Sequence, residues 1–524
     1  MPFSVASVRS FRPRPYHAAA ALFFIVVGAV FYGPYLADLP TSIHAWAQSD
    51  RLALAINFYD YGFQFLTPRT YTLESIGGIT GVEFPLQAYV AALGGLVFGR
   101  GSIVTLYRLL DVAATLLGFY YLFRLVFERT GHFVAGLVPG AFLLASPFFA
   151  FYAGGFLPDP FSLSLSFVAY YYWARFFETR HFPDLRLAVL VLGVAALIKT
   201  TTALHLVAVA GITLLWAFVQ PDRMTLRQRL EFLGTVAGIL GVLVFFFLHN
   251  QLLNETYQSG QFLATIRPIT DPEMLHEVLH SVRRDWLAEY ATNTQYRTLA
   301  VCGVLLVVFI GRNVRHYLPL TLLLLAATGI GLLFVKLMGE QFGVHDYYAI
   351  CAALPPALLL LLLALLNLGR YGGRLRYATS LGLAVLVLSL TANGYKRLHR
   401  RSSDHYLPFP PFTHVWMRGG AAELARARVP QASTILVFNE PSPNIPLVYF
   451  DRRGRTWTPQ AVSAVTTDDF LNRMATDSLD YLVMAPATWA QLPAAQHPAM
   501  AAGFEQVGQS PALVFRRRNR TRPW

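Results

Sequence analysis

Residues 18–36 read A-A-A-A-L-F-F-I-V-V-G-A-V-F-Y-G-P-Y-L, a run without a single charged side chain. As a helix, such a run is long enough to cross a hydrocarbon layer roughly 30 Å thick. Similar apolar runs recur along the chain as far as Leu390. The chain of 524 residues is 55% hydrophobic and only 14% charged, whereas soluble domains carry about 25% charged residues. The sequence therefore predicts an all-α polytopic membrane protein.

The basic residues predict the topology, because short loops rich in Lys and Arg stay on the cytoplasmic side. Arg9, Arg12 and Arg14 precede the first run, which resembles a signal sequence but has no clear cleavage site, so we expect an uncleaved first span. The cytoplasmic loops are marked by Arg124, Arg129 and His132, by Arg175 and Arg180, by Arg223, Arg227 and Arg229, by Arg312 and Arg315, and by Arg370, Arg374 and Arg376. About eleven spans are predicted, near residues 18–36, 104–127, 133–152, 160–178, 186–198, 202–219, 231–249, 298–311, 317–336, 347–367 and 377–394. The shorter apolar stretch 86–99 is predicted to be re-entrant or interfacial.

Three longer polar segments face outside on this map: residues 37–85, residues 250–297 and the tail. The tail changes character at Asn393, where the long apolar runs end. Short β-type segments then alternate with turn signals. These segments are Thr434–Asn439, Leu447–Phe450 and Tyr481–Met484. We therefore expect a transmembrane domain over residues 1–394 and a small extracytoplasmic α/β domain over residues 395–524.

The formal net charge of +13 does not indicate nucleic-acid binding, because the basic residues lie where they orient a membrane protein. The expected partner is the lipid bilayer, and no nucleic acid is expected. Cys302 and Cys351 both fall inside apolar runs, which is typical of small buried thiols. They imply no disulfide framework.

Two carboxylates stand out in the first outer loop. Asp50 lies in H-A-W-A-Q-S-D-R, and Glu83 lies in G-V-E-F-P-L-Q. Apolar and aromatic neighbours at a membrane face can raise the pKa of a carboxylate toward the value that suits a general base. The alternative is that both are solvated or cap a short helix.

Two further charges lie next to predicted spans. Asp159 stands between prolines in F-L-P-D-P-F, where it suits the N-terminal end of a helix and could simply cap it. Lys199 lies in L-I-K-T-T-T between two apolar runs. A lysine at that depth either meets an anion such as a phosphate or extends to the interface.

The segment F-G-V-H-D-Y-Y-A-I places His345, Asp346, Tyr347 and Tyr348 together at the outer entry to a span. These groups can hydrogen-bond a phosphate or a sugar. The tyrosines also suit the aromatic belt of a membrane interface.

A competing motif, H-E-V-L-H, contains His276, Glu277 and His280. This spacing puts two imidazoles on one helical face for zinc, so a membrane zinc protease is an alternative function. The motif lies in a polar amphipathic stretch, and Glu289 is the nearest downstream carboxylate for a third ligand. An amphipathic helix against the membrane face is the favoured interpretation, and we expect no metal site.

Taken together, several short motifs resemble the protein-mannosyltransferase and aminoarabinose-transferase-like superfamily of GT-C-type membrane glycosyltransferases. The motifs are D-R at Asp50, G-V-E-F-P-L, F-L-P-D-P, L-I-K-T-T and H-D-Y-Y, and they run in order from about His44 to Pro356. The resemblance implies a membrane-helix bundle with juxtamembrane helices in the first outer loop. Aminoarabinose transferases have a lysine directly after the motif glutamate, whereas this chain has Phe84, so the donor contacts are expected to differ.

The resemblance also implies roles for individual residues. Asp50 is similar to the catalytic base of the family, and Glu83 to the carboxylate that assists it. Asp159 is similar to an acidic residue near the acceptor or the base. The implied contacts to the carrier phosphate come from Lys199, from Tyr347 or Tyr348 with His345 beside them, and from Arg267 in the long outer loop. Arg51 and Asp346 are expected to line the substrate loops.

The activity implied by the resemblance is inverting transfer of a sugar from a polyprenyl-phosphate carrier to an acceptor hydroxyl. The acceptor would be a lipid, a glycan or a protein, and no cofactor would be required. The site would face the periplasm or exterior, most naturally from a bacterial inner membrane. The lack of a Walker-type or G-x-G-x-x-G loop fits a donor that arrives through the membrane. The main alternative is a polar-lipid transporter or flippase, since Lys199 and Asp159 could also line a translocation path.

Overall fold

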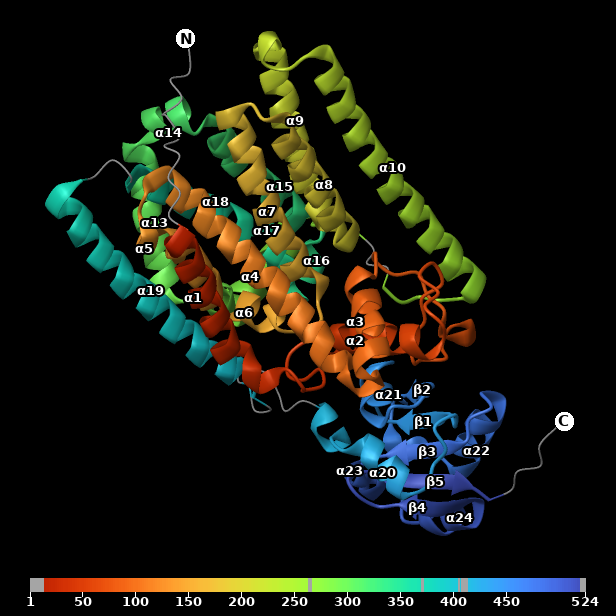
Figure 1. Ribbon diagram of the computed structural model, residues 1–524. Helices are drawn as coiled ribbons and strands as arrows, with labels where there is room; N and C mark the ends of the chain where they lie inside the picture. Colours follow the sequence, from red (N-terminus) through yellow and green to blue (C-terminus); the bar gives the residue numbers. More distant parts are fainter. Residues whose placement is uncertain (1–13, 263–265, 369–371, 404–405, 407–412, 519–524) are drawn as a thin grey trace. The chain divides into compact units, whose positions relative to one another are not determined.

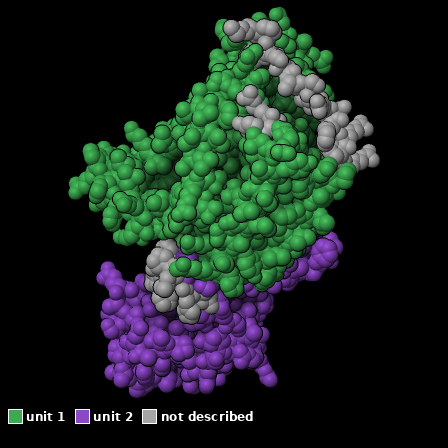
Figure 2. Space-filling model, turned by 90° about the vertical axis from the view of Figure 1, so that its left-hand side faces the viewer, with its two compact units in different colours: residues 1–36, 108–248, 264–402 green, residues 37–107, 249–263, 403–524 purple. Residues whose placement is uncertain are grey.

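The computed structural model describes residues 14–262, 266–368, 372–403, 406 and 413–518 (Figure 1). Arg9, Arg12 and Arg370, which support the predicted topology, lie outside these residues. Contacts between Cα atoms divide the chain into two compact units (Figure 2). Unit 1 comprises residues 1–36, 108–248 and 264–402, and unit 2 comprises residues 37–107, 249–263 and 403–524.

Unit 1 is built from helices, two of which, α4 and α10, continue into unit 2. The longer ones are α1 (Arg14–Tyr32), α4 (Ile103–Thr130), α5 (Phe133–Ala145), α7 (Pro158–Thr179), α8 (Phe182–Ile198), α9 (Ala203–Val219), α10 (Leu226–Tyr257), α11 (Pro272–Ser281), α13 (Asn293–Val308), α15 (Leu318–Leu337), α18 (Leu354–Leu368) and α19 (Gly373–Arg401). The shorter ones are α6 (Pro147–Ala153), α12 (Leu287–Tyr290), α14 (Ile310–His316), α16 (Gly339–Val344) and α17 (Tyr348–Ala352), with a π-helical turn at Val282–Trp286. Helix α7 packs against α8, and α19 packs against α5.

Among the described residues, six helices are long and apolar enough to cross a membrane: α1, α4, α9, α10, α15 and α19. Two bent pairs, α5 with α6 and α13 with α14, raise the number to eight if each pair is one span. The sequence-based map reaches about eleven because it also counts α7, α8 and α17 with α18. Of these, α8 is only 17 residues long, whereas α9 reaches 20 residues with the 3-10 turn Thr200–Thr202 that precedes it. Helix α7 is rich in Ser and Tyr, which lowers its hydropathy. The number eleven therefore stays a prediction.

Three predicted spans are broken in the structure. The segment 133–152 bends by 88° between α5 and α6, where Pro147 cannot donate the backbone hydrogen bond that would continue α5. The segment 298–311 bends by 76° between α13 and α14. The segment 347–367 is interrupted at Ala353, between α17 and α18.

Unit 2 joins the first loop, the end of α10 and the C-terminal part of the chain. The first loop contributes α2 (Ala45–Asp60) and α3 (Leu86–Phe98), which pack together. The resemblance predicted such helices in this loop. The segment 86–99 is thus a helix of 13 residues, and its place relative to a membrane remains a prediction.

The C-terminal part contains one five-stranded sheet with the order β2-β1-β3-β5-β4. Its strands are β1 (Ile435–Phe438), β2 (Gly454–Trp457), β3 (Tyr481–Met484), β4 (Phe504–Gly508) and β5 (Leu513–Arg517). Strand β1 pairs in parallel with β2 and β3, whereas β5 pairs antiparallel with β3 and β4. The helices are α20 (Gly420–Arg426), α21 (Ile445–Phe450), α22 (Thr467–Thr476), α23 (Pro486–Gln491) and α24 (Gln496–Gly503). A small α/β fold in this region confirms the predicted fold class.

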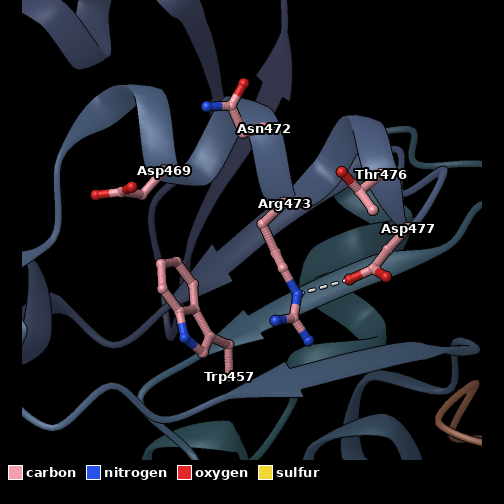
Figure 3. Close-up of a pocket in the computed structure, with 6 residues that line it drawn as sticks. All are labelled: Trp457, Asp469, Asn472, Arg473, Thr476 and Asp477. Atoms are coloured by element: carbon pink, nitrogen blue, oxygen red, sulfur yellow. Dashed lines mark hydrogen bonds and ion pairs between the residues drawn. The ribbon is translucent and has the colours of Figure 1, made fainter.

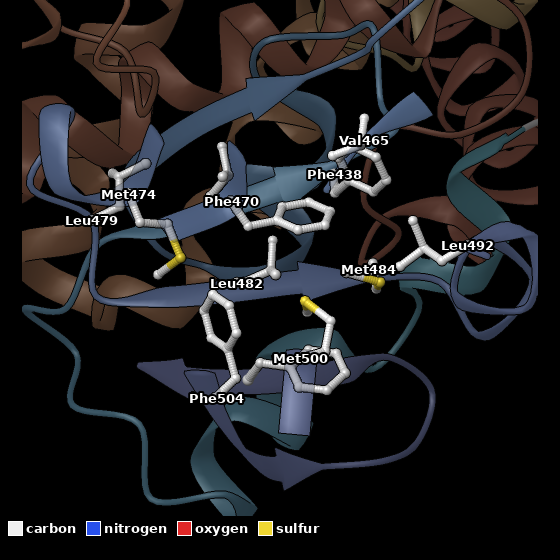
Figure 4. Packing of buried hydrophobic residues seen from close by; sticks show 12 residues of the cluster. Phe438, Val465, Phe470, Met474, Leu479, Leu482, Met484, Leu492, Met500 and Phe504 are labelled. Carbon is white, nitrogen blue, oxygen red and sulfur yellow. The ribbon is translucent and has the colours of Figure 1, made fainter. Parts of the chain in front are cut away.

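The core beside this sheet gathers apolar side chains from the strands and from α22 (Figure 4). Phe438 meets Phe470 of α22 edge to face, with ring centroids 4.7 Å apart. The strands predicted at 434–439 and 481–484 are present as β1 and β3. The strand predicted at Leu447–Phe450 is wrong, because these residues form α21. Pro446 in the first turn favours a helix start there, and a short apolar run does not distinguish a buried strand from a buried helix.

Candidate functional site

Asp50 lies in α2 of unit 2, a helix whose other side chains are mostly buried. Burial raises the pKa of Asp50 to about 7. A hydrogen bond from Asn444 and the charge of Arg51 lower this pKa, while the nearby charge of Glu74 raises it. A carboxylate with a pKa near 7 can accept a proton near neutral pH.

Arg51 and Glu83 form an ion pair beside Asp50, with 2.5 Å between Nη2 and Oε2. Both side chains are largely buried. The Arg51 guanidinium also lies over the ring of Phe262, 4.9 Å from its centroid. The ion pair with Glu83 holds the Arg51 guanidinium at the place from which its charge lowers the pKa of Asp50. Phe84, which follows Glu83, packs against Phe65 with ring centroids 4.9 Å apart.

The backbone before Glu83 is held by two asparagines from the end of α10. Asn254 Oδ1 accepts a hydrogen bond from the Gly81 N–H at 2.6 Å, and Asn250 Nδ2 donates to the Val82 carbonyl at 2.6 Å. A Cβ at Gly81 would lie 2.5 Å from the Asn250 carbonyl oxygen, so only glycine fits there. The chain is thereby fixed two residues before the candidate carboxylate.

Asp159 and Lys199 meet in unit 1. Asp159 lies in the first turn of α7, and Lys199 follows α8 directly. Lys199 Nζ lies 3.6 Å from Asp159 Oδ1, and the two side chains are only 11% and 2% exposed. The sequence predicted a role for each charge separately, whereas the structure pairs them.

The segment His345–Tyr348 forms an aromatic cluster in unit 1. The rings of His345 and Tyr347 stack with centroids 5.3 Å apart, and Tyr347 meets Tyr348 edge to face at 5.0 Å. The Tyr348 hydroxyl donates to Gln341 Oε1 at 3.1 Å.

Asp346, in the same segment, is fully buried. It accepts hydrogen bonds from the Tyr152 hydroxyl, at 2.8 Å, and from Arg401. Arg401 is also fully buried and donates to Glu289 at 2.8 Å. Two carboxylates therefore share one guanidinium, and this fixes the end of α19 to the segment that carries the tyrosines.

The remaining candidates are exposed. The Arg267 side chain is 54% exposed and pairs with Glu340 at 3.2 Å. His276, Glu277 and His280 lie on the exposed side of the amphipathic helix α11, while Val278 and Trp286 are buried. Within the described residues, no three His, Cys, Asp or Glu side chains are grouped to hold a metal ion. The described residues therefore supply no third zinc ligand beside His276 and His280, which the zinc-protease alternative would require.

A shallow groove lies beside α22 in the C-terminal part (Figure 3). Its lining consists of Trp457, Asp469, Asn472, Arg473, Thr476 and Asp477. Arg473 and Asp477 bond each other at 2.7 Å, and no residue predicted from the sequence lies in this groove.

Two residues of these sites were missed by the sequence reasoning. Asn444 donates to Asp50 Oδ1 at 2.8 Å although the two residues are 394 positions apart. Arg401 ends a run of basic residues, which is typical of a solvated helix end. A proline on each side of Asn444 in P-S-P-N-I-P indicates a fixed turn, but nothing in that turn points to Asp50.

A family model described as dolichyl-phosphate-mannose-protein mannosyltransferase matches residues 83–247. The match begins at Glu83 and includes Asp159 and Lys199. A search among curated proteins finds no match.

The fold is similar to that of solved membrane enzymes. ArnT from Cupriavidus metallidurans in the apo state superposes with a TM-score of 0.57 at 13% identity, over 95% of this chain and 98% of that one. The same protein bound to undecaprenyl phosphate gives 0.54 at 14% identity, over 96% and 98%. The apo oligosaccharyltransferase from Archaeoglobus fulgidus gives 0.50 at 13% identity, over 91% and 70%. In its fold, and over the residues that the family model matches, this chain is therefore similar to GT-C membrane glycosyltransferases, in agreement with the resemblance seen in its sequence.

Proposed function

We propose that this protein is an inverting glycosyltransferase that moves a sugar from a polyprenyl-phosphate carrier to an acceptor hydroxyl on the extracytoplasmic face of the membrane. The observation that carries the proposal is Asp50, a carboxyl whose pKa is raised to about 7 beside the Arg51–Glu83 pair. The ArnT relative was solved with undecaprenyl phosphate, and this supports a carrier of that class.

In the proposed reaction, Asp50 accepts the proton of the acceptor hydroxyl. The oxygen then forms a bond to the anomeric carbon, and the bond between that carbon and the phosphate oxygen breaks. The phosphate leaves with the electron pair, and the configuration at carbon inverts. The step needs no cofactor, because the carrier phosphate is itself the leaving group.

Lys199 is the proposed donor to the leaving phosphate. Its ammonium carries three N–H groups, so it can contact a phosphate while it stays beside Asp159, 3.6 Å away. Tyr347, Tyr348 and His345 are proposed to donate to the same phosphate, and Arg267 would join them by exchanging Glu340 for it. Charge that grows on the phosphate is stabilised by donors that are already in place.

The test is transfer of radiolabelled sugar from a panel of synthetic polyprenyl-phosphate donors to a total membrane extract. Wild type should label a product, while Asp50→Asn should lose about 100-fold or more of the rate and still bind the donor, because loss of a general base costs roughly 10²–10⁴-fold. Lys199→Ala should also lose turnover. Asp60→Asn is the matched control, since Asp60 lies in the same helix and bonds Arg100 instead.

Equal activity of Asp50→Asn and wild type would refute the role of Asp50. Movement of the donor between leaflets without any labelled product would favour the flippase alternative.

A further inference from the structure

The side chain of Asn444 reaches from the C-terminal part of unit 2 to the candidate base. Asn444 is fully buried. Its Nδ2 donates to Asp50 Oδ1 at 2.8 Å, and its Oδ1 accepts from the Thr72 N–H at 3.1 Å. One amide therefore contacts both the helix that carries Asp50 and the loop that follows it.

The orientation of this amide is determined by its neighbours. The Thr72 N–H can only donate, so the amide oxygen must face it. The NH₂ group then faces Asp50, which accepts while it is ionised. Among the described residues, this is the one side-chain hydrogen bond to the Asp50 carboxylate, and it engages Oδ1 alone.

The backbone around Asn444 is fixed as well. Ser442 Oγ accepts from the Ile445 N–H at 3.1 Å, and the Asn444 carbonyl accepts from the Val448 N–H at 2.9 Å, which starts α21. Asn444 thus directly precedes a helix whose residues are all buried.

Strand pairing ties the same region to the first loop. The Leu73 N–H donates to the Gly454 carbonyl at 2.8 Å, and the Gly454 N–H donates to the Tyr71 carbonyl at 3.2 Å. A Cβ at Gly454 would lie 1.8 Å from the Ile435 carbonyl oxygen, so only glycine lets β2 approach β1 and the loop together.

Polar side chains also join the C-terminal part to the first loop, at a contact region that we call the junction. Arg100 donates to Asp451 at 2.8 and 2.9 Å and to Asp60 at 2.8 Å. The Tyr71 hydroxyl donates to Asp451 at 2.5 Å, and the Tyr449 hydroxyl donates to the Pro40 carbonyl at 2.8 Å. The C-terminal part and the first loop therefore share one hydrogen-bonded interior.

We propose that Asn444 is a positioning residue for Asp50, and that the C-terminal part of the chain is a component of the catalytic site instead of an accessory domain. This inference rests on the proposed transferase function. By holding Oδ1, Asn444 keeps the carboxylate in one rotamer and presents Oδ2 to the acceptor hydroxyl.

The test is the pH dependence of transfer by Asn444→Ala and Asn444→Asp. Arg51 and Glu74 are the charged groups that also act on Asp50, and both stay unchanged. The Asn444 hydrogen bond lowers the pKa of Asp50, so its loss should move the acid limb of the activity profile to higher pH. At pH 7 we expect kcat to fall about 10- to 100-fold, as for a lost hydrogen bond to a charged group, with little change in KM for the donor.

Asn444→Asp separates positioning from folding. An aspartate has the same shape and can still accept from Thr72, but when ionised it cannot donate to Asp50 and adds a like charge. Its acid limb should move at least as far as that of Asn444→Ala. Tyr449→Phe is the control, because it removes a hydrogen bond at the same junction without touching Asp50, and its profile should keep the wild-type midpoint.

An acid limb at the wild-type pH in both Asn444 variants would overturn the inference, even where kcat is lower at every pH. If wild type transfers no sugar from any donor in the panel, the proposed function fails first. If wild type is active and Asp50→Asn is inactive, only the role of Asn444 is being judged.

Discussion

Replacing Asp50 with asparagine should stabilise the folded protein at neutral and alkaline pH. Asparagine is nearly the same size as aspartate and can still accept the hydrogen bond from Asn444 Nδ2. It cannot ionise, so it removes the cost of holding a negative charge in a poorly solvated place. The expected gain in the free energy of unfolding follows from the pKa of Asp50 in the folded and in the unfolded wild-type chain.

Asp50 has a pKa of about 7 in the folded chain and an ordinary value of 3.8 when exposed. Between these values the unfolded chain has released the proton and the folded chain has kept it. The free energy of unfolding of wild type therefore falls as the pH rises through this window and levels off above 7. At 1.36 kcal/mol for each pH step, the full cost is at most about 4 kcal/mol. Residual solvent contact of Asp50 reduces it to roughly 2–3 kcal/mol.

The assay is thermal unfolding of both proteins in detergent from pH 5 to pH 9. The stability of Asp50→Asn relative to wild type should grow between pH 5 and 7 and stay constant above 7. For a cooperative unit of roughly 200 residues, 1 kcal/mol shifts the midpoint by about 2–4 °C, so the gap should reach about 5–10 °C. Asp60→Asn, which loses a bond to Arg100, should show no such gain. A gap that does not change with pH, or a variant that is less stable at pH 8, would refute a buried and costly Asp50 charge.

Two further outcomes follow from the same structure. The rate of sugar transfer by wild type should fall as the pH drops through about 7, because protonated Asp50 cannot act as a base. Initial rates from pH 5.5 to 9 measure this dependence, and a flat profile would speak against Asp50 as the base. Arg401→Met should lower the free energy of unfolding by about 3–5 kcal/mol, because it leaves the buried carboxylates of Asp346 and Glu289 without their cation. Thermal unfolding of Lys396→Met, which removes an exposed cation from the same helix, should differ from wild type by no more than about 0.5 kcal/mol; equal effects of the two substitutions would show that the buried cluster is unimportant.

The helical membrane architecture could be predicted from the sequence because its cause is local. A long apolar run is a property of consecutive residues, and α1, α4, α9, α10, α15 and α19 all correspond to predicted spans. Breaks within runs were harder to predict. Ala353 separates α17 from α18 just before Pro355 and Pro356, but prolines in the first turn of a helix do not by themselves show whether a run is broken or only bent. The failure at α21 is of the same kind, since four apolar residues suit a strand or a helix equally.

The candidate site could be predicted only as a set of separate residues. Asp50, Arg51 and Glu83 gather in one unit, and Asp159 meets Lys199 in the other, but no sequence pattern states those pairings. The motif of Tyr347 and Tyr348 also contains Asp346, whose expected place was a substrate loop. Asp346 is buried against Arg401, which favours a role in fixing the segment that carries the tyrosines, and its place in a substrate loop stays a prediction.

Asn444 shows why the rest of the candidate site could not be predicted from the sequence. Its function depends on a hydrogen bond between residues 394 positions apart, and its own surroundings predict only a turn before α21. A positioning residue differs in this respect from a base, because a base needs a titratable group whereas a positioning residue needs only a donor in the right place. Any Asn, Gln, Ser, Thr or backbone N–H could supply that donor. The strand pairing at Gly454 and the start of α21 place the side chain of Asn444, and not that of another donor, next to Asp50. The residue that orients Asp50 therefore follows from the packing of the C-terminal sheet against the first loop.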